Sequence, residues 1–154
     1  MIDTPVITNI PARQTACIPL TVPRSEIQNV MGAGIKELMA AIAAQGIKPA
    51  GPRFTYHRRM DPAVFDFEIS IAVTAPVTPV GRVKAGELRA ATVARTVYRG
   101  PYEELPGAWG EFDAWIKANG HEPAPDLWEY YTLGPESGDD PAKWRTELNR
   151  PLVV

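Results

Sequence analysis

A carboxylate stands among aromatic residues in the stretch Leu127-Trp128-Glu129-Tyr130-Tyr131. Alternation along a strand would place Glu129 and Tyr131 on one face and Trp128 and Tyr130 on the other. Aromatic rings attract cations and a carboxylate neutralises them, so this pattern favours flat, apolar, positively charged ligands. The same stretch is equally typical of a solvated outer face with ordinary Glu and Tyr side chains.

A repeat spans about half the chain. The segment 46–50 recurs at 120–124, and the segment 60–69 recurs at 139–148 with the same Asp, Pro, Ala and Glu positions. Repetition at this period predicts a duplicated unit whose copies fold against each other, with a ligand groove where they meet. The second copy has a longer loop, 134–140, which is a natural place for a lid or rim.

Alignment of the two copies shows where they differ. Thr55 stands where the second copy has Glu129, and His57 stands where it has Tyr131. An asymmetric set of side chains on a duplicated frame indicates that one copy is specialised for a ligand. His57 is therefore a candidate ligand-binding residue beside Glu129 and Tyr131.

Two further carboxylates are paired by the repeat. Glu68 and Glu147 occupy equivalent positions on the polar side of their strands. If the helices cover one sheet face, these carboxylates lie on the other and make its potential negative.

Each copy reads as strand, helix, strand, strand, and each helix ends at a glycine, Gly46 or Gly120. Two such units predict an α+β fold, an antiparallel sheet of about eight strands with two helices on one face. We expect one domain over 1–154, with copies at about 5–78 and 86–154. Helical spacing assigns Trp109 and Phe112 to the core. The predicted extended segments are 6–22, 53–59, 64–74, 88–99, 127–133 and 144–153.

Composition excludes several classes of protein. The chain has 154 residues, with 16 Lys and Arg against 18 Asp and Glu, so a basic face for nucleic acid or anionic membranes is not expected. A single cysteine, Cys17, and the lack of a signal-peptide pattern predict a cytoplasmic protein. Two histidines and no cysteine cluster make a metal site unexpected, and no cofactor-binding motif is present.

Several short motifs follow one another in a fixed order. They are Gly51 to His57, Phe65 to Ile69, Tyr98-Arg99-Gly100-Pro101-Tyr102, Trp109 to Trp115, Asn119-Gly120, Glu129-x-Tyr131, and Thr146-Glu147-Leu148 with Pro151. Together they resemble the GyrI-like small-molecule-binding domain, which is also the effector-binding module of AraC-type and BmrR-like multidrug-sensing regulators.

The resemblance implies a small-molecule ligand that is lipophilic and either cationic or planar aromatic. In multidrug-binding relatives a buried glutamate among aromatic residues holds such cations, and Glu129 matches that position. Glu147 matches a second family glutamate that assists or orients. Tyr131 and Tyr56 would be wall residues, and Glu68 and His57 complete the set of expected ligand contacts.

The resemblance leaves three functions open. We expect a binding module first, a hydrolase of cyclopropane-bearing electrophiles with Glu129 and Tyr131 as catalytic residues second, and a DNA gyrase inhibitor third. No helix-turn-helix region is visible, so a stand-alone domain without direct nucleic-acid contact is expected. A protein partner or a homodimer is left open.

Overall fold

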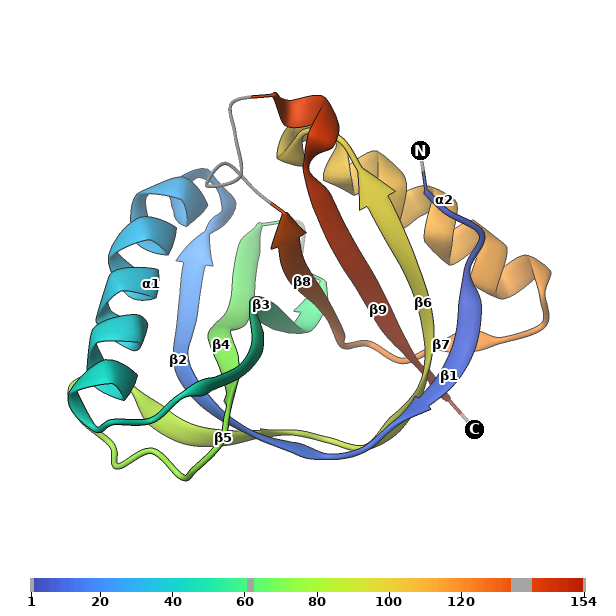
Figure 1. Cartoon of the computed structure of the whole chain (residues 1–154). Helices are drawn as coiled ribbons and strands as arrows, with labels where there is room; N and C mark the ends of the chain where they lie inside the picture. The colour runs from blue at the N-terminus through green and yellow to red at the C-terminus, as the bar shows by residue number, and fades with distance from the viewer. Residues whose placement is uncertain (1, 61–62, 134–139, 154) are drawn as a thin grey trace. The chain divides into compact units, whose positions relative to one another are not determined.

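The computed structural model describes residues 2–60, 63–133 and 140–153 (Figure 1). They divide into two compact units, Pro11–Ala90 and the combination of Met1–Ile10 with Ala91–Val154. We call these the first-copy unit and the second-copy unit. The predicted lid over 134–140 lies outside the described residues except for its last position.

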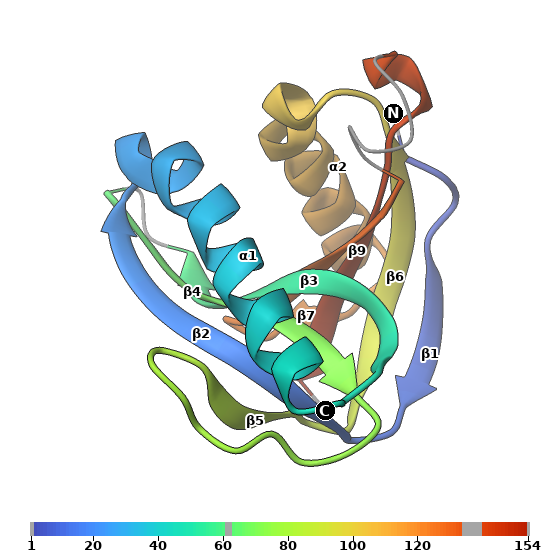
Figure 2. The same cartoon turned by 60° about the vertical axis from the view of Figure 1, so that its left-hand side comes forward.

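The first-copy unit is a four-stranded antiparallel sheet with the strand order β3-β4-β2-β5. Helix α1 packs on β2 and β4, and Figure 2 shows it running over these strands. Its elements are β2 (Arg13–Pro23), the 3-10 turn η1 (Arg24–Glu26), α1 (Ile27–Ala44), β3 (Pro49–Met60), β4 (Val64–Val73) and β5 (Lys84–Leu88).

The core of this unit joins the apolar face of α1 to the sheet. Leu38 and Ile42 are fully buried against Phe67, Ile69 and other strand residues, as the helical spacing predicts. We call the sheet side that meets the helix the helix face of each unit.

The second-copy unit repeats this arrangement. Its antiparallel strand order is β1-β6-β9-β8, with β7 paired to β9, and α2 packs on β6 and β7. Its core contains Phe112, Ile116 and Leu148. Its elements are β1 (Val6–Ile10), β6 (Ala91–Arg99), η2 (Tyr102–Glu104), α2 (Leu105–Ala118), β7 (Glu122–Pro123), β8 (Leu127–Leu133), η4 (Pro141–Lys143) and β9 (Arg145–Val153).

Both helices end in the same way. Gly46 (φ 67°) and Gly120 (φ 79°) adopt the left-handed conformation that glycine accommodates without strain. Gly46 N–H donates to Ala43 and the following N–H to Ile42, and the equivalent bonds leave Gly120 and His121. These pairs of bonds form a Schellman motif at each helix end. The short repeat seen in the sequence is therefore a repeated helix stop.

Strand register confirms the duplication residue by residue. Positions aligned by the repeat face equivalent cross-strand partners in β3–β4 and in β8–β9. The register also shifts at the same place in both copies, between His57 and Arg59 and between Tyr131 and Leu133, as at a β-bulge. The equivalent pairs are Thr55–Ile69 and Glu129–Leu148, His57–Phe67 and Tyr131–Thr146, and Tyr56–Glu68 and Tyr130–Glu147.

The structure confirms the α+β class and the strand-helix-strand-strand order, and it divides two predicted strands. The run 6–22 breaks at Pro11, and its first part becomes β1, which pairs with β6 and so joins the second-copy unit. The predicted strand 88–99 is interrupted after Leu88, the last residue of β5, and resumes at Ala91 as β6. Strand β5 pairs with β2. Within the described residues, no helix is long and apolar enough to cross a membrane.

Candidate functional site

The side chain of Glu129 points to the helix face of the second-copy unit. Glu129 on β8 lies opposite Leu148 on β9, and Leu148 belongs to the core under α2. Directly opposed residues of antiparallel strands share a face, so the carboxylate faces α2. Only 8% of Glu129 is exposed.

Two neighbouring side chains bind the carboxylate of Glu129. The indole Nε1 of Trp109 on α2 donates a hydrogen bond to Oε2 at 3.1 Å. The hydroxyl of Tyr131, two residues along β8, donates a longer bond of 3.5 Å to Oε1. A buried carboxylate needs such donors, because burial otherwise penalises its charged form.

Aromatic rings continue from Tyr131 along the same face. The ring centroid of Tyr102, in the turn before α2, lies 5.9 Å from that of Tyr131 and 5.0 Å from that of Trp144. These separations are those of paired aromatic rings. We call Trp109, Glu129, Tyr131, Tyr102 and Trp144 the Glu129 cluster.

The Glu129 cluster combines two kinds of group that can contact a cation. A carboxylate supplies a negative charge with little water around it, and electron-rich ring faces lie beside it. Such a surface can hold a positively charged aromatic molecule by charge and by ring contacts together.

Glu147 does not join Glu129. It lies opposite Tyr130, so its side chain is on the other face of the same sheet. There, Arg95 Nε lies 3.1 Å from Glu147 Oε1 and donates to Asn149 Oδ1 at 2.8 Å. The structure therefore holds this carboxylate in an ion pair within the second-copy unit.

His57 occupies the equivalent of the Tyr131 position in the first-copy unit. It is 6% exposed, and a 3.2 Å hydrogen bond joins its Nε2 to the hydroxyl of Thr55. Its ring stacks on Phe67 with centroids 5.4 Å apart and meets the edge of Phe65 at 5.7 Å. The first-copy unit thus has a hydrogen bond between residues 55 and 57, as the second-copy unit has between residues 129 and 131. In the first-copy unit, the hydroxyl of Thr55 stands in place of the Glu129 carboxylate.

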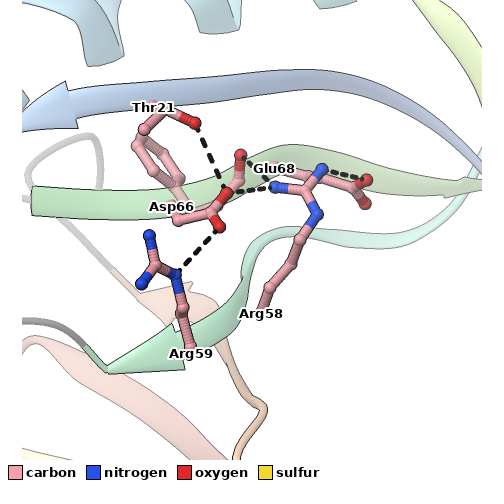
Figure 3. A network of polar contacts seen from close by, with 6 residues as sticks. Thr21, Arg58, Arg59, Asp66 and Glu68 are labelled. Carbon is pink, nitrogen blue, oxygen red and sulfur yellow. Dashed lines mark hydrogen bonds and ion pairs between the residues drawn. The ribbon is translucent and has the colours of Figure 1, made fainter.

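Tyr56 and Glu68 lie opposite each other on the other face of that unit. Arg58, the residue within the register shift, reaches both carboxylates of β4, with 2.9 Å to Glu68 and 2.8 Å to Asp66 (Figure 3). Arg59 adds a 3.3 Å contact to Asp66. These ion pairs offset the negative charge that the sequence predicts for this face.

Thr21 also donates a hydrogen bond of 3.4 Å to the Asp66 carboxylate (Figure 3). Partial burial acts to raise the pKa of Asp66, but Arg59 and Arg58 outweigh it and hold that pKa below its usual range. Because the arginines are substantially exposed, these pairs contribute little to stability.

The sequence does not mark three members of the Glu129 cluster, Trp109, Tyr102 and Trp144, as site residues. Helical spacing predicts that Trp109 lies in the core, and its ring centroid does lie 5.6 Å from that of Phe112, but its indole N–H also donates a hydrogen bond to the Glu129 carboxylate. A buried indole N–H needs an acceptor, and that requirement is the signal that points to Glu129. Trp144 begins the predicted extended segment 144–153, whereas β9 begins one residue later, and Tyr102 lies in the turn η2. The pairing of their rings with each other and with Tyr131 appears only in the tertiary structure.

Two hollows lie elsewhere on the described surface. The larger, about 550 Å³, lies between the end of α1 and the segment 80–83, and the smaller, about 240 Å³, lies between the segment 2–5 and α2 at Glu111 and Trp115. Neither is lined by a predicted site residue. Over the described ranges, no group of three His, Cys, Asp or Glu residues is placed to hold a metal ion.

Two strand-helix-strand-strand units with matching register define the class of duplicated α+β domains. Residues 3–152 match the family described as the GyrI-like small molecule binding domain. The chain therefore belongs to the GyrI-like small-molecule-binding domain family. No curated protein matches the sequence significantly.

Solved structures show the same fold. The C-terminal domain of EcmrR superposes with a TM-score of 0.86 at 22% identity, covering 97% of each chain. EcmrR in its complex with DNA gives a TM-score of 0.82 at 22% identity over 97% of this chain, which spans only 57% of that chain.

Two more distant structures carry functional descriptions. A hydrolase from Listeria innocua matches with a TM-score of 0.67 at 15% identity, covering 97% of this chain and 91% of its own. SAV2435 bound to tetraphenylphosphonium matches with a TM-score of 0.67 at 11% identity, covering 98% and 94%. At these identities the likeness establishes the fold.

Proposed function

We propose that this domain binds small molecules that combine aromatic rings with a positive charge, and that Glu129 is the charge contact. The observation that carries the proposal is the buried Glu129 carboxylate, held by Trp109 and flanked by the ring of Tyr131. A carboxylate in this setting gains a partner when a cation arrives, and its cost of burial falls.

The rings of the cluster supply the second part of the affinity. A cation over an aromatic face gains about 0.5–2 kcal/mol, and a ring pair adds about 0.5–1.5 kcal/mol. Tyr131, Tyr102 and Trp144 offer such faces within one connected group. A rigid ligand with several rings can use more than one of them without losing internal freedom.

The family supports this assignment. SAV2435, which shares the fold, is bound to tetraphenylphosphonium, a lipophilic cation with four phenyl rings. We extend that ligand class to this chain as a proposal.

Tyr56, His57 and Glu68 lie in the first-copy unit, and their substitution tests whether that unit also contributes to binding.

Calorimetric titration with two matched probes tests the proposal. Methyltriphenylphosphonium carries a charge, and triphenylphosphine oxide has the same three phenyl rings without net charge. We expect the cation to bind at least about 10-fold more tightly, equivalent to about 1.4 kcal/mol for the charge contact. Equal affinity for the two probes, or binding of neither, would contradict the proposal.

A hydrolase is the second candidate, favoured by the hydroxyl of Tyr131 beside Oε1 of Glu129. Glu129 would accept a proton from a water that attacks a carbon of the cyclopropane ring. The ring C–C bond would break, its electron pair would pass to a conjugated carbonyl of the electrophile, and Tyr131 would donate a hydrogen bond to the oxygen anion that forms there. The related fold of a Listeria innocua hydrolase supports testing it. Incubating a cyclopropane-bearing electrophile with catalytic amounts of protein decides the matter, because binding alone yields no hydrolysed product.

A further inference from the structure

The side chain of Thr146 lies next to the Glu129 cluster and carries a buried hydroxyl group. Thr146 on β9 lies opposite Tyr131 on one side and opposite Tyr98 on the other, so it shares the helix face with Glu129. It is 0% exposed, and its hydroxyl has no hydrogen-bond partner among the described residues.

The neighbouring phenol does not provide that partner. The hydroxyl of Tyr98 donates to the carbonyl of Pro101 at 2.8 Å. Burial, together with the nearby carboxylate of Glu104, raises the pKa of Tyr98. The Tyr98 hydroxyl therefore keeps its proton and its hydrogen bond to Pro101.

A buried hydroxyl without a partner destabilises a fold. Valine has the same shape as threonine, favours strands equally and would remove the cost. A residue that lowers stability in this way beside a binding site is typical of a group retained for function. The hydroxyl of Thr146 is therefore a candidate ligand contact.

The position of Thr146 fixes what it would contact. Glu129 lies opposite Leu148, two residues beyond Thr146, so Glu129 and Thr146 are diagonal neighbours across the strand pair. Such neighbours are about 7–8 Å apart. A ligand whose charge lies at Glu129 can place a substituent of one of its rings at Thr146.

The ring of Tyr102 lies near this position. Its ring packs against Tyr131, which lies opposite Thr146, and against Trp144. Trp144 precedes Thr146 by two residues in the chain. Tyr102 is half-buried and belongs to a single 3-10 turn. A ligand ring that takes the place of the Tyr102 ring would lie against the same two aromatic residues.

On the basis of the proposed function, we infer that Thr146 is a specificity-determining residue of the same site. The ligand class it selects is an aromatic cation that carries a hydrogen-bonding group, such as a phenol or an aromatic amine, on one ring. Glu129 binds the charge and Thr146 binds the ring substituent.

A pair of probes that differ in one hydroxyl tests this inference. Tetraphenylphosphonium and (4-hydroxyphenyl)triphenylphosphonium are titrated into the wild-type chain and into Thr146→Val and Thr146→Ser. We expect the wild type and Thr146→Ser to prefer the hydroxylated probe by about 10-fold. Thr146→Val should lose that preference while keeping its affinity for tetraphenylphosphonium, and its Tm should rise by about 2–4 °C.

The outcomes distinguish the role of Thr146 from the proposed cation site. If the wild type binds both probes equally, or if Thr146→Val keeps the preference, the role of Thr146 is overturned and the cation site stands. A lower Tm for Thr146→Val would show that the hydroxyl already has a stabilising partner and would also overturn the inference. If the wild type binds neither probe, the proposed function fails and the inference falls with it.

Discussion

Trp109 on α2 and Glu129 on β8 are joined by a hydrogen bond of 3.1 Å between the indole Nε1 and Oε2, and both residues are 8% exposed. The bond connects the helix of the second-copy unit to the one buried glutamate of the expected ligand-binding set. It orients the carboxylate and leaves Oε1 next to the hydroxyl of Tyr131.

Replacing Trp109 by Phe should weaken cation binding. The ring packing against Phe112 is largely kept, but the donor that orients the carboxylate is lost. We expect about a 10-fold lower affinity for tetraphenylphosphonium and a loss of about 1–3 kcal/mol in stability. Trp115→Phe, the same change on the same helix away from the cluster, is the control. Equal affinities of the two variants would show that the indole N–H has no part in binding.

The two glycines that stop the helices should be equally important for stability. Gly46→Ala and Gly120→Ala both force a side chain into the left-handed conformation. Each should destabilise the chain by about 1–2 kcal/mol in urea unfolding, with an unchanged m-value. A cost at one site and none at the other would argue against equivalent helix stops.

The thiol of Cys17 should be inert in the folded chain. Burial, together with the negative charge of Glu68, raises its pKa to about 11, although Lys84 and Arg58 act in the opposite direction. At pH 8 we expect no reaction with an aromatic disulfide reagent until urea unfolds the chain. Rapid labelling of the native chain would contradict this expectation.

The same pKa shift predicts a pH dependence of folding. The folded thiol keeps its proton up to about pH 11, whereas the unfolded thiol loses it near its ordinary value of 9.0. The stabilising contribution is therefore complete below pH 9 and is lost as the pH rises through 11. Wild type should lose more stability than Cys17→Ala between pH 9 and pH 11, and parallel curves would speak against the shift.

The fold was largely predictable because the two copies supported each other. Gly46 and Gly120 marked both helix ends, and the strand pair β8–β9 was predicted within one residue of its observed bounds. The edge strands were missed or misplaced. Strand β5 lacks an alternating pattern, and β1 pairs with β6, a partner far away in the sequence. Periodicity reports which residues are buried, but it does not report which strand a segment will pair with.

The candidate site was only partly predictable from the sequence. Alternation correctly placed Glu129 and Tyr131 on one face, but Glu147 lies on the other face beside Arg95. The repeat alone gives no reason to separate the two glutamates. Trp109 needed the tertiary structure, because helical spacing describes its ring and not the acceptor of its N–H.

The most direct test of the central claim is calorimetric titration of tetraphenylphosphonium into wild type and Glu129→Gln. Glu111→Gln is the control, since it removes the same charge from an exposed position on α2. We predict that Glu129→Gln lowers the affinity at least about 10-fold while Glu111→Gln and the wild type remain alike. Unchanged affinity in Glu129→Gln would contradict the account.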